Sequence, residues 1–345
     1  MPPIPETATD LPLDSLSTHL AEILPRFDGP LQADLLSGGR SNPTYALTEG
    51  TNEWILRRPP YGAVWKSAHD IGREARVLQA LAGTAVPVPA VVDHCRDESV
   101  IGAPFYVMPR IAGRTLRDRS DTEALTPQQR RGLAESLVST LVALHEIDPS
   151  EVGLGDFGRP DGYLERQLRR WDQQWDSLRT PDRVDASELQ HALAAAMPTS
   201  TLTGIVHGDY KLDNVLVSTE DPTRIVAVLD WEMATLGDTL ADIGFLLSFW
   251  DEIGGPHNPL TAGATALEGF PSAHEMATMY AEQRDIDVND LSWYVAFSNY
   301  KLAVILQQIH VRHLRGETRG EGFEELGPMI NPLIELALDR LEEHR

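Results

Sequence analysis

The residues best suited to chemistry gather in one short stretch of this 345-residue chain. Apolar Ile205-Val206 leads into the stretch and Val215-Leu216-Val217 leads out of it, and the polar side chains between them are His207, Asp209, Lys211, Asp213 and Asn214. Apolar segments on either side of a polar loop are typical of buried strands that hold catalytic side chains between them. A carboxylate that can take up a hydroxyl proton, followed five residues later by an asparagine that can bind magnesium, suits phosphoryl transfer. We therefore expect Asp209 to be catalytic and Asn214 to be a metal ligand.

A second carboxylate stands where such chemistry would need it. Residues 225–229 form a β-prone apolar run that ends abruptly at Asp230, the expected second metal ligand. The pattern His-x-Asp-x-Lys-x-x-Asn matches the catalytic loop of protein kinases. Each piece alone has an ordinary explanation, because loops often contain locally bonded polar residues and many strands end at an Asp. A hydrolase with Asp209 and Asp213 as paired carboxylates is an alternative, and it predicts no need for ATP.

The composition limits the classes of function. With 42% hydrophobic residues the chain can bury a sizeable core and is long enough for two domains. Its 52 acidic and 29 basic residues give a net charge of −23, which disfavours nucleic acids and anionic membranes as partners. The single cysteine, Cys95, excludes an internal disulfide. The sequence shows neither a leader pattern nor an apolar run near the ~20 residues of a membrane span, so a soluble, cytoplasmic protein is expected.

The N-terminal part contains a candidate phosphate-binding turn. Residues 35–47 have the pattern of a strand, a Gly38-Gly39 turn and a second strand. Glycines allow backbone amides to approach a phosphate closely, and Ser41 and Asn42 add donors. An ordinary hairpin turn would use the same glycine pair.

The following strand and helix supply a candidate ion pair. The strand ends near Arg57, at the position where a kinase-like sheet carries a phosphate-binding lysine, and arginine keeps that charge. Alternation along the strand favours Arg57 over Arg58 as the residue that faces a nucleotide. A helix is expected to begin at Ser67 as its N-cap, and its Glu74 is the expected partner of Arg57. A solvated pair with a neighbouring arginine is the alternative for Glu74.

Residues 109–114 are rich in proline and glycine and suit a hinge between two lobes. The expected lobes are residues 1–108, which hold a small antiparallel sheet, and residues 109–345, which are mainly helical. Backbone groups from Met108 to Ile111 could lie against a nucleotide base. Asp242 is expected to brace the catalytic loop through hydrogen bonds, and residues 290–310 are expected to form a long amphipathic helix.

Taken together, these residues resemble the aminoglycoside phosphotransferase family, small-molecule kinases with a protein-kinase-like fold. The resemblance runs from about residue 38 to about residue 247 and is carried by His207-Gly208-Asp209-Tyr210-Lys211-Leu212-Asp213-Asn214 and Leu229-Asp230-Trp231-Glu232. Four further stretches resemble a branch that includes the kinase-like domain ahead of acyl-CoA dehydrogenases in some animal proteins. They are Gly38-Gly39-Arg40-Ser41-Asn42-Pro43-Thr44-Tyr45, Leu56-Arg57-Arg58-Pro59, Arg73-Glu74-Ala75-Arg76-Val77-Leu78 and Gln167-Leu168-Arg169-Arg170-Trp171.

The resemblance implies an α+β, bilobal fold and a mechanism that uses ATP and Mg²⁺. Asp209 would accept the proton of the substrate hydroxyl or orient that hydroxyl, and Asn214 and Asp230 would bind magnesium. Lys211 would neutralise charge on the transferring phosphoryl group. Arg57, braced by Glu74, would stand where the family usually has lysine.

The acceptor is a small molecule with a hydroxyl group, but its class stays open. Family members phosphorylate aminoglycosides, macrolides, choline-like alcohols, sugars and hydroxyacyl thioesters. The branch favours a hydroxylated acyl compound, whereas the acidic surface favours a cationic antibiotic, and the acceptor pocket is expected to include residues after Phe249 and on the helix of residues 290–310. A pseudokinase in which Arg57 holds a nucleotide without turnover, as a sensor or scaffold, is the alternative to an enzyme. The presence of Asp209, Asn214 and Asp230 argues against it.

Overall fold

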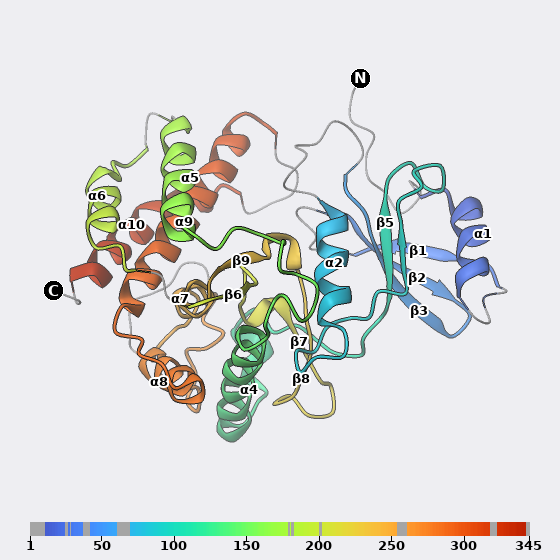
Figure 1. The fold of residues 1–345 in the computed structure, drawn as a ribbon, viewed down its shortest axis with the longest axis horizontal. Helices are drawn as coiled ribbons and strands as arrows, with labels where there is room; N and C mark the ends of the chain where they lie inside the picture. Colours follow the sequence, from blue (N-terminus) through green and yellow to red (C-terminus); the bar gives the residue numbers. More distant parts are fainter. Residues whose placement is uncertain are drawn as a thin grey trace. The chain divides into compact units, whose positions relative to one another are not determined.

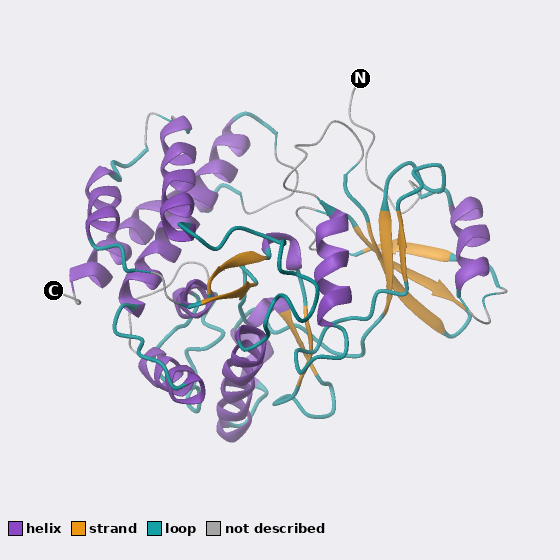
Figure 2. Ribbon diagram, viewed as in Figure 1, coloured by secondary structure: helices purple, strands orange, loops and turns teal. Residues whose placement is uncertain are grey.

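The structure is a computed structural model that describes residues 11–24, 27, 29–36, 42–60, 70–178, 180, 183–199, 202–253, 261–317 and 323–342. Its contacts divide the chain into two compact units (Figure 1). The first comprises Met1–Gly113 and Val226–Met233, and the second comprises Arg114–Ile225 and Ala234–Arg345. An antiparallel sheet is the centre of the first unit, and the second unit is mainly helical (Figure 2), as the sequence predicted.

The first unit is built on a five-stranded antiparallel sheet with the strand order β1-β2-β3-β5-β4. The strands are β1 (Gln32–Leu35), β2 (Thr44–Glu49), β3 (Asn52–Arg57), β4 (Asp93–Cys95) and β5 (Phe105–Pro109). β2 and β3 form a hairpin whose turn contains Gly50 at φ +59°, a conformation that glycine adopts without strain. Helix α1 (Leu13–Ile23) buries Leu16 and Leu20 in the same apolar cluster as Leu47 and Leu56 of the sheet.

Helix α2 (Ile71–Leu81) holds Glu74 in its first turn. It begins at Ile71 because the Asp70 carboxylate accepts the backbone N–H groups of Gly72 and Arg73 and so acts as the N-cap. The expected cap, Ser67, lies outside the described residues. The 3₁₀ turn η3 (Trp231–Met233) packs against α2, which ties this late segment of the chain to the first unit.

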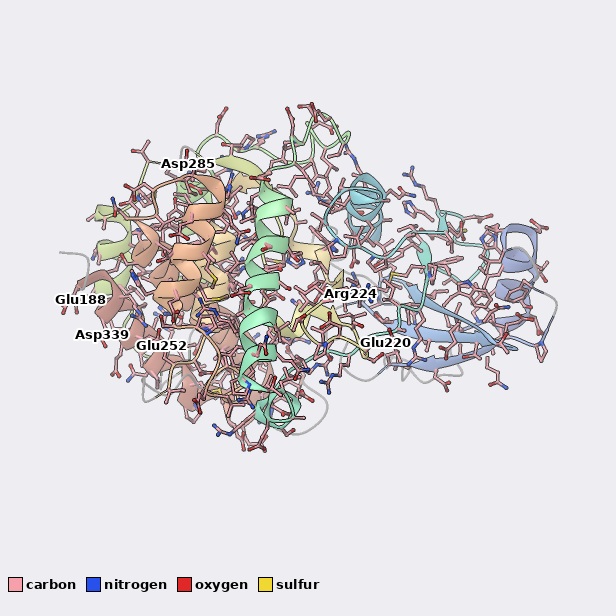
Figure 3. The ribbon with its side chains drawn as sticks, turned by 90° about the horizontal axis from the view of Figure 1, so that it is seen from below. Glu188, Glu220, Arg224, Glu252, Asp285 and Asp339 are labelled. Carbon is pink, nitrogen blue, oxygen red and sulfur yellow. The ribbon has the colours of Figure 1, made fainter. Side chains whose placement is uncertain are left out.

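The helices of the second unit are α3 (Arg119–Glu123), α4 (Pro127–His145), α5 (Tyr163–Ser177), α6 (Ser187–Ala195), α7 (Leu240–Ser248), α8 (Ala273–Arg284), α9 (Leu291–Leu314) and α10 (Leu326–Glu342). The long helix predicted over residues 290–310 is present as α9, which packs against α5, α7 and α10. In the described part of the chain, no helix is long and apolar enough to cross a membrane. Exposed carboxylates such as Glu188, Glu252 and Asp339 carry the acidic surface of this unit (Figure 3).

Short strands frame the predicted catalytic loop. β6 (Thr203–Val206) pairs antiparallel with β9 (Thr235–Asp238), and the loop follows β6 directly. The 3₁₀ turn η2 (Leu212–Asn214) then leads into β7 (Val215–Val217), and β8 (Ile225–Val228) precedes Asp230. Helix α7 begins immediately after β9, so Asp242 stands in its first turn.

Candidate active site

The first unit brings Arg57 and Glu74 together, as the sequence predicted. Arg57 Nη1, at the end of β3, donates a hydrogen bond to Glu74 Oε1 on α2. The side chains are 11% and 1% exposed, so this is a buried ion pair. Burial lowers the pKa of Arg57, but the charges of Glu74 and Asp230 outweigh it, so that the pKa lies above its ordinary value and the guanidinium stays charged. Burial also raises the pKa of Glu74, and the charge of Arg57 opposes that rise.

The neighbouring Arg58 has a different environment. It is fully buried, and its guanidinium lies 5.4 Å from the centroid of the Tyr45 ring. Its Nη2 donates to the Tyr45 hydroxyl at 2.8 Å, and its Nη1 donates to the Pro59 carbonyl at 2.8 Å. Arg58 therefore belongs to the packing of the sheet, and Arg57 is the arginine that lies among the predicted site residues.

Asp230 occupies a left-handed turn and contacts the same arginine. Its φ is +64°, which is uncommon for a residue other than glycine, although Asp tolerates it better than most. The buried Trp231 helps to hold the turn, since its Nε1 donates to the Val228 carbonyl at 3.0 Å. Arg57 Nη2 donates to Asp230 Oδ1 at 3.3 Å. One guanidinium thus contacts Glu74 and Asp230 together.

In the second unit, Asp242 holds the backbone of the predicted catalytic loop. Its Oδ2 accepts the backbone N–H of His207 at 2.6 Å, and its Oδ1 accepts that of Gly208 at 2.7 Å. Burial raises the pKa of Asp242, but the interactions with His145, His207 and Gly208 lower it more, so the carboxylate stays ionised. The prediction that Asp242 braces this loop is confirmed.

Asp209 and Asn214 are joined by hydrogen bonds across the loop. Asn214 Nδ2 donates to Asp209 Oδ2 at 2.6 Å and to the Asp209 carbonyl at 2.8 Å. This arrangement turns the amide oxygen of Asn214 away from Asp209. The backbone N–H of Asp209 donates to His207 Nδ1 at 3.2 Å, so the His207 ring supports the loop.

Lys211 stands between two carboxylates. Its Nζ lies 3.5 Å from Asp209 Oδ1, 3.7 Å from Asp213 Oδ2 and 4.7 Å from the centroid of the Phe249 ring. Burial raises the pKa of Asp213, and the charge of Lys211 opposes that rise. Asp209, Lys211 and Asn214 are therefore assembled in one place, whereas the pairing of Arg57, Glu74 and Asp230 is a property of the other unit.

Sequence reasoning missed two residues that support the loop. His145, at the end of α4, has Nε2 at 3.2 Å from Asp242 Oδ2 and Nδ1 at 2.6 Å from the Tyr280 hydroxyl. Burial lowers the pKa of His145, so the buried imidazole is neutral. Lys301 of α9 donates to the Gly208 carbonyl at 2.6 Å. The sequence carried a signal for Lys301 alone, because a lysine on the apolar side of a helix is rarely buried without a partner.

The remaining predicted nucleotide-binding residues belong to the first unit. Gly38, Gly39 and Ser41 lie outside the described residues. Asn42 is buried shortly before β2, Met108 is buried in β5, and Ile111 is half-buried in the segment that follows β5. Contact of these residues with a nucleotide stays a prediction.

A pocket in the second unit lies beside Lys211. Its apolar lining consists of Leu116, Leu212, Leu246, Phe249, Trp250 and Ala264, its hydroxyls are Thr261 and Thr265, and its charged groups are Arg117, Lys211 and Asp213. The expectation that the acceptor pocket uses residues after Phe249 and on α9 remains a proposal. Residues after Phe249 line this pocket, but none of its described lining residues comes from α9. Its lining combines a mainly apolar wall with two cations and one carboxylate.

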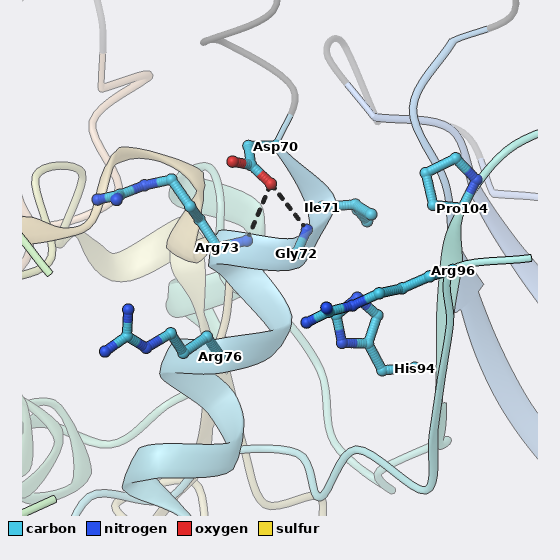
Figure 4. A pocket seen from close by; sticks show the side chains of 8 residues that line it. All are labelled: Asp70, Ile71, Gly72, Arg73, Arg76, His94, Arg96 and Pro104. Carbon is cyan, nitrogen blue, oxygen red and sulfur yellow. Dashed lines mark hydrogen bonds between the residues drawn. The ribbon is translucent and has the colours of Figure 1, made fainter. Parts of the chain in front are cut away.

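Another pocket, in the first unit, contains several basic side chains (Figure 4). Its lining consists of Asp70, Ile71, Gly72, Arg73, Arg76, His94, Arg96 and Pro104. In this view Arg73 and Arg76 extend from one side of α2, while His94 and Arg96 lie on the other side. The first free amides of α2 are already bonded to Asp70. Since the basic groups do not converge on one point, we assign no ligand to this pocket.

The described residues contain no group of three or more His, Cys, Asp or Glu side chains arranged to hold a metal ion. Magnesium does not require such a group, because it usually keeps several waters and takes one or two carboxylates together with substrate phosphates. The Asp230 side chain is 32% exposed, and the Asn214 amide oxygen is turned away from Asp209. Both are oxygen donors of the kind that magnesium prefers.

The sequence of this chain matches a known protein family and its relatives. The model of a family described as "Phosphotransferase enzyme family" matches residues 33–278. "Acyl-CoA dehydrogenase family member 11" of Gallus gallus is 34% identical over 338 residues, which cover 94% of this chain and 43% of that protein. The chain therefore spans less than half the length of this curated relative.

Solved structures show the same fold. A protein of Ralstonia eutropha, provisionally named an aminoglycoside phosphotransferase, is 32% identical, with a TM-score of 0.82 and coverage of 96% of this chain and 99% of that one. A thermostable mutant of the aminoglycoside phosphotransferase APH(4)-Ia, in ternary complex with AMP-PNP and hygromycin B, is 19% identical, with a TM-score of 0.59. The match covers 93% of this chain and 98% of the mutant, and at this identity it shows the fold alone.

Proposed function

Because this chain belongs to the phosphotransferase enzyme family, whose model matches its residues 33–278, we propose that it transfers the γ-phosphoryl group of ATP to a hydroxyl of a small molecule. Membership of this family makes the chain a small-molecule phosphotransferase, and its fold is kinase-like. The observation that carries the proposal is the arrangement around Asp209, where a charged lysine and a bonded asparagine surround the carboxylate. This is the set of groups that phosphoryl transfer to a hydroxyl requires.

The proposed nucleotide site uses Arg57 on the phosphates and Glu74 to hold Arg57 in place. The ion pair fixes the guanidinium, so its fork is oriented before the nucleotide arrives. Asp230 and Asn214 are the residues that would each offer an oxygen to magnesium, and the ion would supply positive charge to shield the phosphates. The contact between Arg57 and Asp230 is a reason to expect that nucleotide and metal binding depend on each other.

In the transfer step, the acceptor oxygen attacks the γ-phosphorus and the bond from that phosphorus to the β–γ bridging oxygen breaks. ADP leaves, and the proton of the hydroxyl passes to Asp209. Lys211, 3.5 Å from Asp209 Oδ1, offsets charge on the transferring group. Since positioning and electrostatics dominate this chemistry, Asp209→Asn should lower turnover by about 10³-fold and leave nucleotide binding in place.

We propose a hydroxylated acyl compound as the acceptor, with a hydroxyacyl-CoA thioester as the first candidate. The pocket beside Lys211 supports this choice, because its wall is mainly apolar and its charged groups include Arg117 and Lys211 against one carboxylate, Asp213. An acyl chain suits the apolar wall and the phosphates of CoA suit the cations, whereas a polycationic aminoglycoside would be repelled. The relative named "Acyl-CoA dehydrogenase family member 11" gives independent support.

The test is a panel of acceptors assayed for ATP consumption with magnesium, and it includes hydroxyacyl-CoAs, aminoglycosides, macrolides, choline and sugars. We expect turnover on a hydroxyacyl-CoA, loss of turnover in Asp209→Asn and loss on removal of magnesium. Turnover on an aminoglycoside alone would contradict the acceptor class. Tight binding of Mg–ATP with no turnover on any compound would favour the nucleotide-binding pseudokinase.

Arg117→Glu tests the pocket itself. Arg117 is exposed and lines the pocket, so reversal of its charge should raise KM for a hydroxyacyl-CoA about fivefold or more without changing KM for ATP. Arg224→Glu is the matched control, because Arg224 is also exposed in the second unit but does not line this pocket. An equal effect of the two substitutions would show that only net charge matters.

A further inference from the structure

Lysine is rare in this chain, and two of the three lysines lie beside Asp209. The sequence contains 26 arginines and only Lys66, Lys211 and Lys301. Lys211 belongs to the catalytic loop, but Lys301 comes from α9, far along the chain. Lys301 is 9% exposed, and burial of an ammonium group is costly unless the group is paired. Its place therefore calls for an explanation that neither helix propensity nor solubility supplies.

The contacts of Lys301 are specific. Its Nζ donates to the Gly208 carbonyl at 2.6 Å, and it lies 4.3 Å from the centroid of the Phe245 ring and 6.0 Å from that of Trp171. Aromatic faces stabilise a cation that has lost its water. Phe245 in turn packs against Phe249, with 5.1 Å between the ring centroids, and Phe249 carries Lys211 at 4.7 Å. Two neighbouring rings of α7 and its C-cap thus each support one lysine.

The carbonyl that Lys301 holds belongs to the peptide group that bears Asp209. The N–H of the same peptide donates to His207 Nδ1, and the preceding peptide donates its N–H to Asp242. Gly208 itself has φ +82°, a conformation that glycine adopts without strain, so the chain turns sharply here. Lys301 thus binds the carbonyl of this peptide, and the Asp242 carboxylate binds the N–H of the peptide before it.

We propose that Lys301 is a positioning residue, whose charged form fixes the Gly208–Asp209 peptide and with it the catalytic carboxylate. The inference deepens the proposed phosphotransfer and depends on it for the consequence to turnover. The role of Lys301 in placing the loop does not depend on the proposed phosphotransfer. The ammonium of Lys301 lies between an aromatic ring and this one carbonyl, so it is the charge at this place that the proposal requires.

The charge of Lys301 should titrate within reach of experiment. Burial lowers its pKa from 10.5 to about 8, the charges of Asp209 and Asp242 oppose this, and those of Lys211 and Arg170 add to it. As pH rises above about 8, the charge-assisted bond to Gly208 weakens and turnover should fall. In the unfolded chain Lys301 keeps its proton up to higher pH than in the folded protein. Above about pH 8 the unfolded chain therefore binds more protons than the folded protein, so the contribution of Lys301 to stability becomes more favourable as pH rises. Turnover and stability should therefore change in opposite directions.

The first test is a titration of the ¹³C-lysine-labelled protein by NMR, which has only three lysines to assign. We expect one side-chain signal to titrate near pH 8 and to be absent in Lys301→Met. The carbonyl carbon shift of Gly208 should follow the same midpoint. A Gly208 carbonyl that does not respond to this titration would overturn the proposal.

The second test compares amide hydrogen exchange in variants. Lys301→Met keeps the length of the side chain and should speed exchange at Gly208 and Asp209 about tenfold, lower kcat about tenfold or more, and change KM for ATP less than twofold. Lys301→Arg keeps a charge at all accessible pH values and should retain protection and extend turnover above pH 9. Arg312→Met, exposed on the same helix, should change neither.

The outcomes separate this proposal from the proposed function. Faster loop exchange in Lys301→Met, in a protein that phosphorylates no acceptor, would support the positioning role and count against the enzyme. Unchanged exchange and an unchanged alkaline limb in a folded Lys301→Met variant would overturn the positioning role, whatever the enzyme does. If Lys301→Met does not fold, the wild-type titration and Lys301→Arg decide the question.

Discussion

Replacement of Arg57 by methionine should destabilise the protein strongly, because it leaves the Glu74 carboxylate buried without its partner. Glu74 is 1% exposed and Arg57 Nη1 is bonded to it, so water cannot take the place of the guanidinium without opening the packing. Removing one member of a buried ion pair costs about 3–5 kcal/mol. Glu74→Gln in the same background should recover most of that loss, because a neutral amide is far less costly to bury than an unpaired carboxylate.

The destabilisation should also depend on pH. Burial is the largest influence on the pKa of Glu74, and the charge of Arg57 is the main influence that opposes it, so the pKa should rise further in Arg57→Met. A carboxyl group whose pKa is higher in the folded than in the unfolded protein takes up a proton on folding. Stability from this group is therefore present at low pH and is lost as pH rises through the folded pKa. The variant should be closer to the wild type at about pH 5 than at about pH 8.

The assay is urea unfolding of the wild type, the two single variants and the double variant at both pH values. Arg110→Met is the matched control, because Arg110 pairs with Glu53 at 3.0 Å in the same unit, but the two side chains are 47% and 51% exposed. An exposed pair of this kind contributes about 0–1 kcal/mol. A loss in Arg57→Met no larger than in Arg110→Met, or a loss that Glu74→Gln does not reduce, would refute the reasoning.

Three further predictions concern the second unit. Asp242→Asn leaves one acceptor oxygen for the two backbone N–H groups of His207 and Gly208. We therefore expect a loss of about 2–4 kcal/mol of stability in urea unfolding and faster amide hydrogen exchange at Gly208. Unchanged exchange at Gly208 would contradict this prediction. Burial keeps the His145 imidazole neutral in the folded protein, whereas the same side chain takes up a proton more readily in the unfolded chain. Stability should therefore fall as pH drops below the ordinary histidine pKa of 6.5, and it should fall less steeply in His145→Gln. Gly237→Ala would place a Cβ 2.6 Å from a ring carbon of Tyr163, and melting should show a loss of about 1–3 kcal/mol; an unchanged melting temperature would show that the ring moves aside.

The sequence predicted the chemistry of the catalytic loop because that chemistry is local. The residues from His207 to Asn214 form one short loop, and their spacing in the sequence brings the Asp209 carboxylate, the Asn214 amide and the Lys211 ammonium near each other. Helix periodicity likewise predicted α9, and the kinase-like order of strand and helix predicted the pairing of Arg57 with Glu74. The N-cap of α2 differed from expectation, because Asp70 can bond two amides at once.

The bracing of the loop by Asp242 was expected from the sequence, but the tertiary structure alone decided the other contacts that hold this chemistry in place. Arg57 and Asp230 are 173 residues apart, His145 and Asp242 are 97 apart, and Lys301 and Gly208 are 93 apart. A hydrogen bond between residues so far apart in the sequence depends on how the whole chain folds, and no local pattern of residue types predicts it. The residue types of the site were thus readable in the sequence, whereas the fixed backbone at Asp209 and the shared contact of Arg57 with two carboxylates are products of the fold.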